Sequence, residues 1–190
     1  MMEKRLSEEQ GRALVMLARA TLRHRLLGAD EPQPPQDPAL GKEAATFVTL
    51  KKAGQLRGCI GNLQPVGAIW RGVRDNALNA AFNDPRFTPL RADEVERVEL
   101  HVSVLSASRP LPYGSAEELL ALLRPGVDGV ILRQGGRSAT FLPQVWEQLP
   151  DPRQFLDHLC RKAGLADGCW GTGRAEIFVY EVQGFAEERG

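Results

Sequence analysis

The chain has 190 residues, which fits one domain with room for a smaller second lobe. A chain of this length can bury a core without disulfides or a structural metal. Lys and Arg together number 24, and so do Asp and Glu, so the formal net charge is zero. A zero net charge excludes an overall basic field that would attract nucleic acid or an anionic membrane.

The N-terminus and the cysteines indicate a cytoplasmic protein. The first residues are polar and lack an apolar signal-peptide core, and no apolar run approaches the ~18 residues of a membrane span. The odd count of three cysteines, without a signal peptide, predicts reduced thiols. No Cys-x-x-Cys pair occurs and the histidines are widely separated, so no metal site is predicted.

The first elements are a helix and a strand. Ser7 and Gln10 have the spacing of a capping box, and apolar residues then recur at helical spacing. This pattern predicts a helix over about residues 8–27, with Gly28 as its stop. A proline-rich connection follows, and the β-branched and aromatic run 46–50 then predicts a strand.

The middle of the chain predicts a second helix and a second strand. Pro65 suits the first turn of a helix, and an apolar stripe runs behind it over residues 66–81. The sequence Asn83-Asp84-Pro85 is expected to end that helix. Apolar and polar residues alternate over 98–104, which is typical of a half-buried strand.

The C-terminal part predicts two helices, a hairpin and a closing strand. Capping patterns at 115–118 and 151–154 each precede a helix, and Gly135-Gly136 joins the two arms of a hairpin over 130–142. Alternation over 177–182 predicts the closing strand. Because helices and strands do not alternate regularly, the order favours an α+β fold with an antiparallel or mixed β-sheet flanked by helices.

The best candidate for a working site is the hexamer Leu56-Arg57-Gly58-Cys59-Ile60-Gly61. We expect a loop in which Gly58 and Gly61 permit positive φ and close approach, and whose amides form an anion nest. Arg57, two residues before the thiol, favours the thiolate form. The helix near Pro65 adds positive potential if its N-terminus faces this loop.

Two interpretations of Cys59 remain open from the residues alone. The thiol can act as a nucleophile, redox thiol or metal ligand, or it can fill space in the interior. Cys160 lies on an apolar helix face and Cys169 precedes Trp170, so both are expected to pack in the interior. His101 is expected on the outer, exposed face of its strand, and no catalytic triad is predicted.

The hexamer is also where a family resemblance rests. The chain resembles the AMMECR-type domain family, which in prokaryotes is called the AmmeMemoRadiSam system protein A, and the hexamer is the hallmark of that family. The resemblance covers about residues 7–187. Further matching segments are 46–52, 76–87, 102–105, 126–130, 141–146 and 162–165.

The resemblance implies a fold and a setting. It implies a single AMMECR-type domain over 7–187, with a larger and a smaller lobe around an antiparallel sheet. It also implies a genomic setting with a Memo-like protein and a radical S-adenosylmethionine (SAM) protein as possible partners. It supplies neither an established activity nor a cofactor, so the cofactor stays unknown.

Polar residues of the matching segments extend the candidate site. We expect Arg57, Arg86 and the hexamer amides to form an anion pocket beside the thiol of Cys59, the candidate catalytic residue. Structural roles stay open as well, since Asp84 can form a turn or cap, Arg86 can pair with a buried acid, and Gln144 can satisfy backbone groups. The candidate ligand-binding residues are Arg57, Gly58, Gly61, Asn76, Asp84, Arg86 and Gln144.

Three functional hypotheses follow. The first is a module that binds a small anionic ligand or a partner protein, working with the Memo-like and radical SAM proteins. The second is a thiol-dependent enzyme that uses Cys59 with Arg57. The third is an RNA-binding protein, which the balanced charge disfavours.

Overall fold

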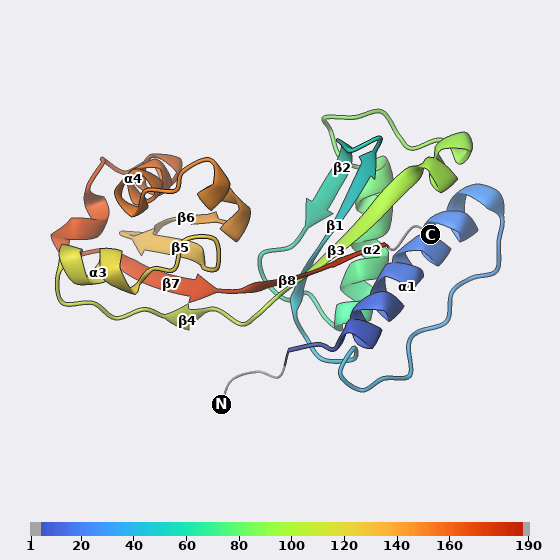
Figure 1. The fold of residues 1–190 in the computed structure, drawn as a ribbon, viewed down its shortest axis with the longest axis horizontal. Coiled ribbons are helices and arrows are strands. Elements are labelled where there is room, and N and C mark those ends of the chain that lie inside the picture. The colour runs from blue at the N-terminus through green and yellow to red at the C-terminus, as the bar shows by residue number, and fades with distance from the viewer. Residues whose placement is uncertain (1–4, 188–190) are drawn as a thin grey trace. The chain divides into compact units, whose positions relative to one another are not determined.

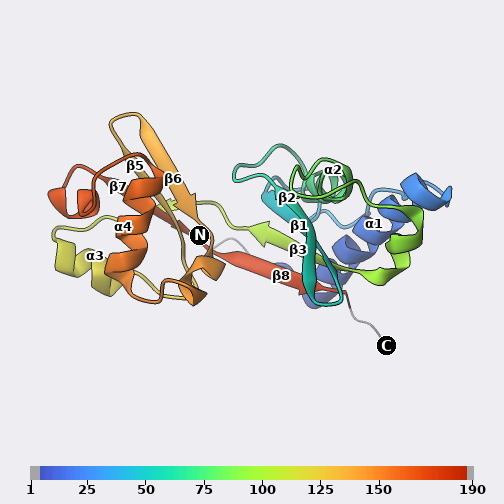
Figure 2. The ribbon, with the colours of Figure 1, turned by 90° about the horizontal axis from the view of Figure 1, so that it is seen from above.

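The computed structural model describes residues 5–187, and the chain forms two compact units. Unit 1 runs to Leu105 and resumes at Gln183, and unit 2 comprises Ser106–Val182. Figures 1 and 2 show a sheet with helices in each unit. Within residues 5–187, no helix combines the length and the apolar character that a membrane crossing requires.

Each unit is built on a four-stranded sheet, of order β2-β1-β3-β8 in unit 1 and β4-β7-β5-β6 in unit 2. The predicted α+β class, with antiparallel pairing of the strands, is confirmed. The elements of the first sheet and its helices are α1 (Glu8–Leu27), β1 (Ala45–Lys52), β2 (Gln55–Gly61), α2 (Ile69–Phe82), the 3-10 helix η1 (Ala92–Arg97), β3 (Val98–Leu105) and β8 (Val182–Ala186). Those around the second sheet are β4 (Arg109–Pro110), α3 (Ala116–Leu122), β5 (Gly129–Gln134), β6 (Arg137–Phe141), η2 (Pro143–Glu147), α4 (Pro152–Lys162), η3 (Cys169–Thr172) and β7 (Glu176–Tyr180).

Local sequence signals set the helix ends as predicted. Ser7 Oγ accepts a hydrogen bond from the Gln10 amide at 3.2 Å, and the Gln10 side chain accepts one from the Ser7 amide at 2.8 Å. Gly28 ends α1 with a φ of 70°, which only glycine adopts without strain. Asp151 accepts a hydrogen bond from the Gln154 amide at 2.9 Å and thereby caps α4.

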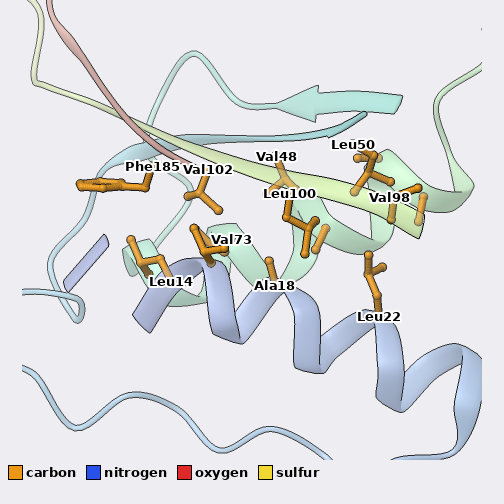
Figure 3. Packing of buried hydrophobic residues seen from close by; sticks show 14 of the residues in the cluster. Leu14, Ala18, Leu22, Val48, Leu50, Val73, Val98, Leu100, Val102 and Phe185 are labelled. Carbon is orange, nitrogen blue, oxygen red and sulfur yellow. The ribbon is translucent and has the colours of Figure 1, made fainter. Parts of the chain in front are cut away.

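The core of unit 1 lies between one face of its sheet and the helices α1 and α2. Figure 3 shows side chains of β1 and β3 directed toward α1 and α2, with Phe185 of β8 at the end of the cluster. Because strand side chains alternate, the residues between these core positions lie on the opposite face, which we call the outer face. The labelled core residues are Leu14, Ala18, Leu22, Val48, Leu50, Val73, Val98, Leu100, Val102 and Phe185.

The start of α2 differs from the prediction. We expected Pro65 in its first turn, but α2 begins at Ile69, and Val66 lies before it with 66% of its surface exposed. The amide of Ile69 donates to the carbonyl of Lys42 at 2.8 Å. A distant segment thus satisfies an amide that a helix start leaves without an internal partner, and this long-range bond helps to set the first residue of α2.

The segment predicted as one closing strand, residues 177–182, is divided between two strands that belong to different sheets. β7 pairs with β4 and β5 in unit 2, whereas β8 belongs to the unit 1 sheet. Beyond β8, the amide of Glu187 donates to the carbonyl of Leu100 at 2.9 Å. Alternating apolar and polar residues predict a strand but not the sheet to which it belongs. The division of this segment between β7 and β8 therefore follows from tertiary packing.

Unit 2 contains a disulfide, so the prediction of reduced thiols is wrong for two cysteines. Cys160 in α4 is bonded to Cys169 in η3, and both are buried, as expected from their apolar surroundings. Gly164 and Gly168, with φ values of 72° and 73°, turn the chain back after α4. That reversal places the two cysteines together, and Cys59 is the free cysteine.

The disulfide predicts a labelling pattern and a stability effect. In unfolded, unreduced protein, iodoacetamide should label Cys59 alone, and after reduction it should label all three cysteines. Reduction should also lower the free energy of unfolding by about 2–3 kcal/mol, because the bond closes a loop across nine sequence positions. Intact mass and urea denaturation measure the two effects.

The matched control is Cys59→Ser, which should take up no label before reduction. Three labels on the unreduced wild-type protein would contradict the disulfide.

Candidate functional site

The hallmark hexamer is an edge strand, not a loop. It lies within β2, which pairs with β1 from Gln55 to Gly61. Gly58 and Gly61 are outside the positive-φ region, so the expected nest of loop amides is wrong. The turn that precedes β2 is formed instead by Ala53 and Gly54, at φ values of 50° and 77°.

The two glycines of the hexamer are explained by close packing. A Cβ atom at Gly58 would lie 2.1 Å from the carbonyl oxygen of Ala80, in the last turn of α2. A Cβ atom at Gly61 would lie 2.2 Å from the ring of Phe47 on β1. The carbonyl end of α2, which carries partial negative charge, therefore lies against Gly58 of the hexamer.

Cys59 lies on the outer face of the unit 1 sheet. Since Gly58 faces α2, alternation directs the next side chain away from the helices. Register pairs Thr49 of β1 with Cys59 on one side and with His101 of β3 on the other. The three side chains form one row across the outer face, which we call the Cys59 row, and each is half-buried.

The contacts in the Cys59 row are specific. Thr49 Oγ1 donates a hydrogen bond to Cys59 Sγ at 3.1 Å. His101 lies on the outer face as predicted, but Cys59 shares that face, which the sequence reasoning missed. Neighbouring strands are roughly 4.8 Å apart, so the backbones of Cys59 and His101 are separated by about 10 Å, with Thr49 between them. Burial, and secondarily the charge of Lys51, lower the pKa of His101.

The free edge of β2 is covered by Asp84 and Arg86. The amide of Cys59 donates to Asp84 Oδ2 at 2.9 Å, and its carbonyl accepts from Arg86 Nη2 at 3.4 Å. In an antiparallel strand the N–H and C=O of one residue point to the same side, so both groups of Cys59 point away from β1. The pair Asp84–Arg86 thus satisfies the backbone where a further strand would otherwise bind.

Asp84 is the anchor of this arrangement. Its side chain is buried and accepts from Arg86 Nε at 2.9 Å and Nη2 at 2.8 Å. These hydrogen bonds from Arg86 outweigh burial and, with the amide of Cys59, hold the pKa of Asp84 well below its usual range. The Arg86 side chain remains 55% exposed, so part of its guanidinium is presented to solvent beside Cys59.

Arg57 is directed to Glu94 and not to the thiol. Its Nε and Nη2 atoms donate to the two carboxylate oxygens of Glu94 at 3.2 and 2.9 Å, and Nη1 donates to the carbonyl of Thr88 at 2.9 Å. Lys52 Nζ contacts the same carboxylate at 2.7 Å. The hydrogen bonds to Arg57, followed by those to Lys52, lower the pKa of Glu94 to about 2. Arg57 therefore joins β2 to η1, and the expected Arg57–thiol pair is not formed.

Asn76 is not a member of the Cys59 row, and Gln144 belongs to the other unit. Asn76 is buried, and its Nδ2 donates to the carbonyl of Thr46 at 3.0 Å and to Asn62 Oδ1 at 3.1 Å, so it fixes the chain beyond β2. Gln144 is exposed on η2 and belongs to unit 2, whereas the other candidate residues belong to unit 1. Over the described range 5–187, no group of three or more His, Cys, Asp or Glu residues is placed to hold a metal ion.

Comparison with known proteins gives consistent matches over nearly the whole chain. The family model described as AMMECR1 matches residues 15–185. A protein of Methanothermobacter thermautotrophicus is 36% identical over 186 residues, covering 96% of this chain and 97% of that protein. Protein Mbar_A1807 of Methanosarcina barkeri is 38% identical over 189 residues, covering 96% and 93%. The crystal structure of the uncharacterized protein PH0010 from Pyrococcus horikoshii matches with a TM-score of 0.81 and 33% identity, covering 96% of this chain and 94% of that chain.

The packing of α2 on β2 predicts a strong effect at Gly58. Gly58→Ala should lower the free energy of unfolding by about 1–3 kcal/mol, because the added methyl group meets the backbone of Ala80. Gly184→Ala is the control, since a Cβ atom there meets nothing within 4 Å, and it should change stability by less than about 0.5 kcal/mol. Urea denaturation compares the two, and equal effects would rule out the proposed contact.

The ion pair of Glu94 predicts a pH-dependent stability. A carboxyl whose folded pKa is lowered stabilises the fold above its unfolded pKa, here about 4.5, and loses that effect as the pH falls toward about 2. Glu94→Gln should therefore destabilise the protein by about 1–3 kcal/mol at neutral pH. The difference from wild type should shrink through this pH range in urea denaturation.

Asp93→Asn is the matched control on the same 3-10 helix, because the Asp93 side chain is 54% exposed in its pair with Arg91. Asp93→Asn should change the free energy of unfolding by no more than about 0.5 kcal/mol at neutral pH and at any pH down to about 2. A Glu94→Gln effect that does not vary with pH would contradict the ionised pair.

Proposed function

The chain belongs to the AMMECR1 family, and from that premise we propose that unit 1 is a binding module whose outer sheet face recognises a small anionic ligand or an anionic group of a partner protein. The recognition site is the Cys59 row together with Arg86 at the free edge of β2. The ligand would contact the thiol and the exposed part of the guanidinium at once.

The observation that carries the proposal is the half-buried Cys59 sulfur beside an oriented cation. Arg86 is fixed by its two hydrogen bonds to Asp84, and its Nη1 atom has no hydrogen bond to any residue within 5–187. Its pKa is raised first by the bond to Asp84 and, to a smaller extent, by the charge of Cys59. Its Nη2 atom also donates to the backbone carbonyl of Cys59 at 3.4 Å, so an oriented guanidinium, the group that pairs best with anions, lies beside this residue.

The contacts of the sulfur favour recognition over catalysis. Thr49 donates a hydrogen bond to Sγ, and a donated bond stabilises a thiolate but does not remove the proton from a thiol. A catalytic base must reach the group that it deprotonates, to within about 3 Å or through one water. His101 is two strands away, so it does not meet that condition directly.

A thiol-dependent enzyme is the second candidate, and His101 is the observation that favours it. Burial lowers the pKa of His101 and so favours the neutral imidazole, the form that accepts a proton. A ligand or a water beside Thr49 could connect it to Cys59. In this version Arg86 takes the role that the sequence assigned to Arg57.

The Memo-like and radical SAM proteins that the resemblance implies are the proposed partners. An anionic segment of either protein would occupy the same face. The RNA-binding hypothesis gains no support from the geometry of the Cys59 row. A cytoplasmic location stays a prediction from the sequence, and the disulfide in unit 2 is of a kind more frequent in oxidising compartments.

The test measures alkylation of Cys59 in the native protein with neutral iodoacetamide and anionic iodoacetate. We expect Arg86→Gln to lower the rate ratio of iodoacetate to iodoacetamide about two- to fivefold, because one cation near the sulfur is removed. Arg86→Lys should restore most of the ratio. Arg91→Gln is the control, since the Arg91 side chain is 78% exposed in a surface pair with Asp93.

The same assay separates the hypotheses. Native Cys59 that resists both reagents, or an unchanged ratio in Arg86→Gln, would remove the binding proposal. A shift in the pH dependence of labelling in His101→Gln would support the enzyme, and an unchanged profile would exclude His101 as its base. Saturable protection of Cys59 by the added Memo-like protein would identify that partner.

A further inference from the structure

Unit 2 contains a cavity of about 390 Å³ whose lining residues all belong to that unit. Its walls are the end of β5 at Gln134, the segment 165–167 after α4, part of η3, and Arg174 before β7. Figure 1 shows β5 and β7 side by side in unit 2, together with α4. The register between β5 and β7 ends with Arg133 opposite Glu176, and Gln134, which still pairs with Arg137 of β6, lies at the same end of the sheet as Arg174 just before β7.

The walls of this cavity are held in place by covalent and hydrogen bonds. The disulfide joins Cys169 in the wall to Cys160 in α4. Asp157 Oδ1 accepts from the amide of Gly168 and from Trp170 Nε1, both at 2.8 Å. The cavity is therefore preformed, as most small-molecule sites are.

Two polar groups of the cavity are without internal partners. Gln134 Oε1 is buried and has no hydrogen-bond partner within the described part of the chain. A buried oxygen without a hydrogen bond is energetically unfavourable. The side-chain amide of Gln134 would therefore gain a hydrogen bond if it turned so that Oε1 accepted one from a ligand in the cavity. Arg174 is exposed, and no ion pair or hydrogen bond within residues 5–187 engages its guanidinium.

The other polar groups of the cavity are already engaged. Asp167 accepts from Arg161 Nε at 2.9 Å, and Thr172 Oγ1 donates to the carbonyl of Cys169 at 2.9 Å. Leu165 and Ala166 supply an apolar wall. Within residues 5–187, the groups of the cavity without a partner are therefore the side-chain amide of Gln134 and the guanidinium of Arg174, beside an apolar surface.

We propose that this cavity binds an N-acylated apolar amino acid, either free or as the C-terminal residue of a peptide. Its carboxylate pairs with Arg174, since guanidinium and carboxylate geometries match. Its N–H donates to Gln134 Oε1, and its side chain packs against Leu165 and Ala166. This site is independent of the function proposed for unit 1.

The test is an NMR titration of the ¹⁵N-labelled full chain with N-acetyl-leucine. We expect saturable shifts of the amides of Ala166, Cys169 and Thr172, with a Kd in the millimolar range for a ligand of this size. The methyl ester, which lacks the carboxylate, and the N-methyl derivative, which lacks the N–H, should each bind at least about fivefold more weakly. Acetyl-Ala-Ala-Leu tests the peptide source, and tighter binding than that of N-acetyl-leucine would assign it.

Variants locate the site. Arg174→Gln and Gln134→Leu should each weaken binding of N-acetyl-leucine about tenfold, whereas Arg109→Gln, an exposed arginine of the same unit outside the cavity, should not. Gln134→Leu removes the unpaired acceptor, so it should fold at least as stably as wild type. Cys59→Ser should bind like wild type, which separates this result from the function of unit 1.

No shifts with N-acetyl-leucine, equal binding of its methyl ester, or unchanged binding by Arg174→Gln would overturn the proposal.

Discussion

The buried carboxylate of Asp84 is the constraint on which the candidate site of unit 1 depends. It binds the amide of Cys59 and the guanidinium of Arg86, and it follows directly on the end of α2. One ionised group thereby completes the edge of the sheet, orients a cation and fixes the backbone that carries the thiol. Without it, β2 would present unpaired backbone groups, which favour pairing with another chain.

The close packing of α2 on β2 determines which residues remain available for binding. Gly58 lies against the backbone of Ala80, so the helices occupy the inner face and Cys59 takes the outer one. The sheet then holds Thr49 and His101 in line with the sulfur, because register in a sheet is rigid once one face is packed. In unit 2 a disulfide holds the wall of the cavity, and Gln134 Oε1 and Arg174 in that cavity have no partner within residues 5–187.

Much of the secondary structure could be predicted because its signals act over a few residues. The capping box of Ser7 and Gln10, the left-handed Gly28 and the cap at Asp151 each involve neighbours within one helical turn. The α+β class followed from the irregular order of helices and strands, which is also a property of the linear chain. The strand geometry of the hexamer was missed because two glycines within six residues resemble a turn.

The sequence by itself determined the local elements and the presence of a thiol in a motif with two glycines and one arginine. Only the tertiary structure decided the partners of that motif, since Thr49 lies 10 positions from Cys59 and Glu94 lies 37 positions from Arg57. It likewise decided the bond between Cys160 and Cys169 and the division of the closing segment between two sheets. The physical reason is that local signals fix backbone conformation within a few residues, whereas register, ion pairing and disulfide bonding depend on which distant segments pack together.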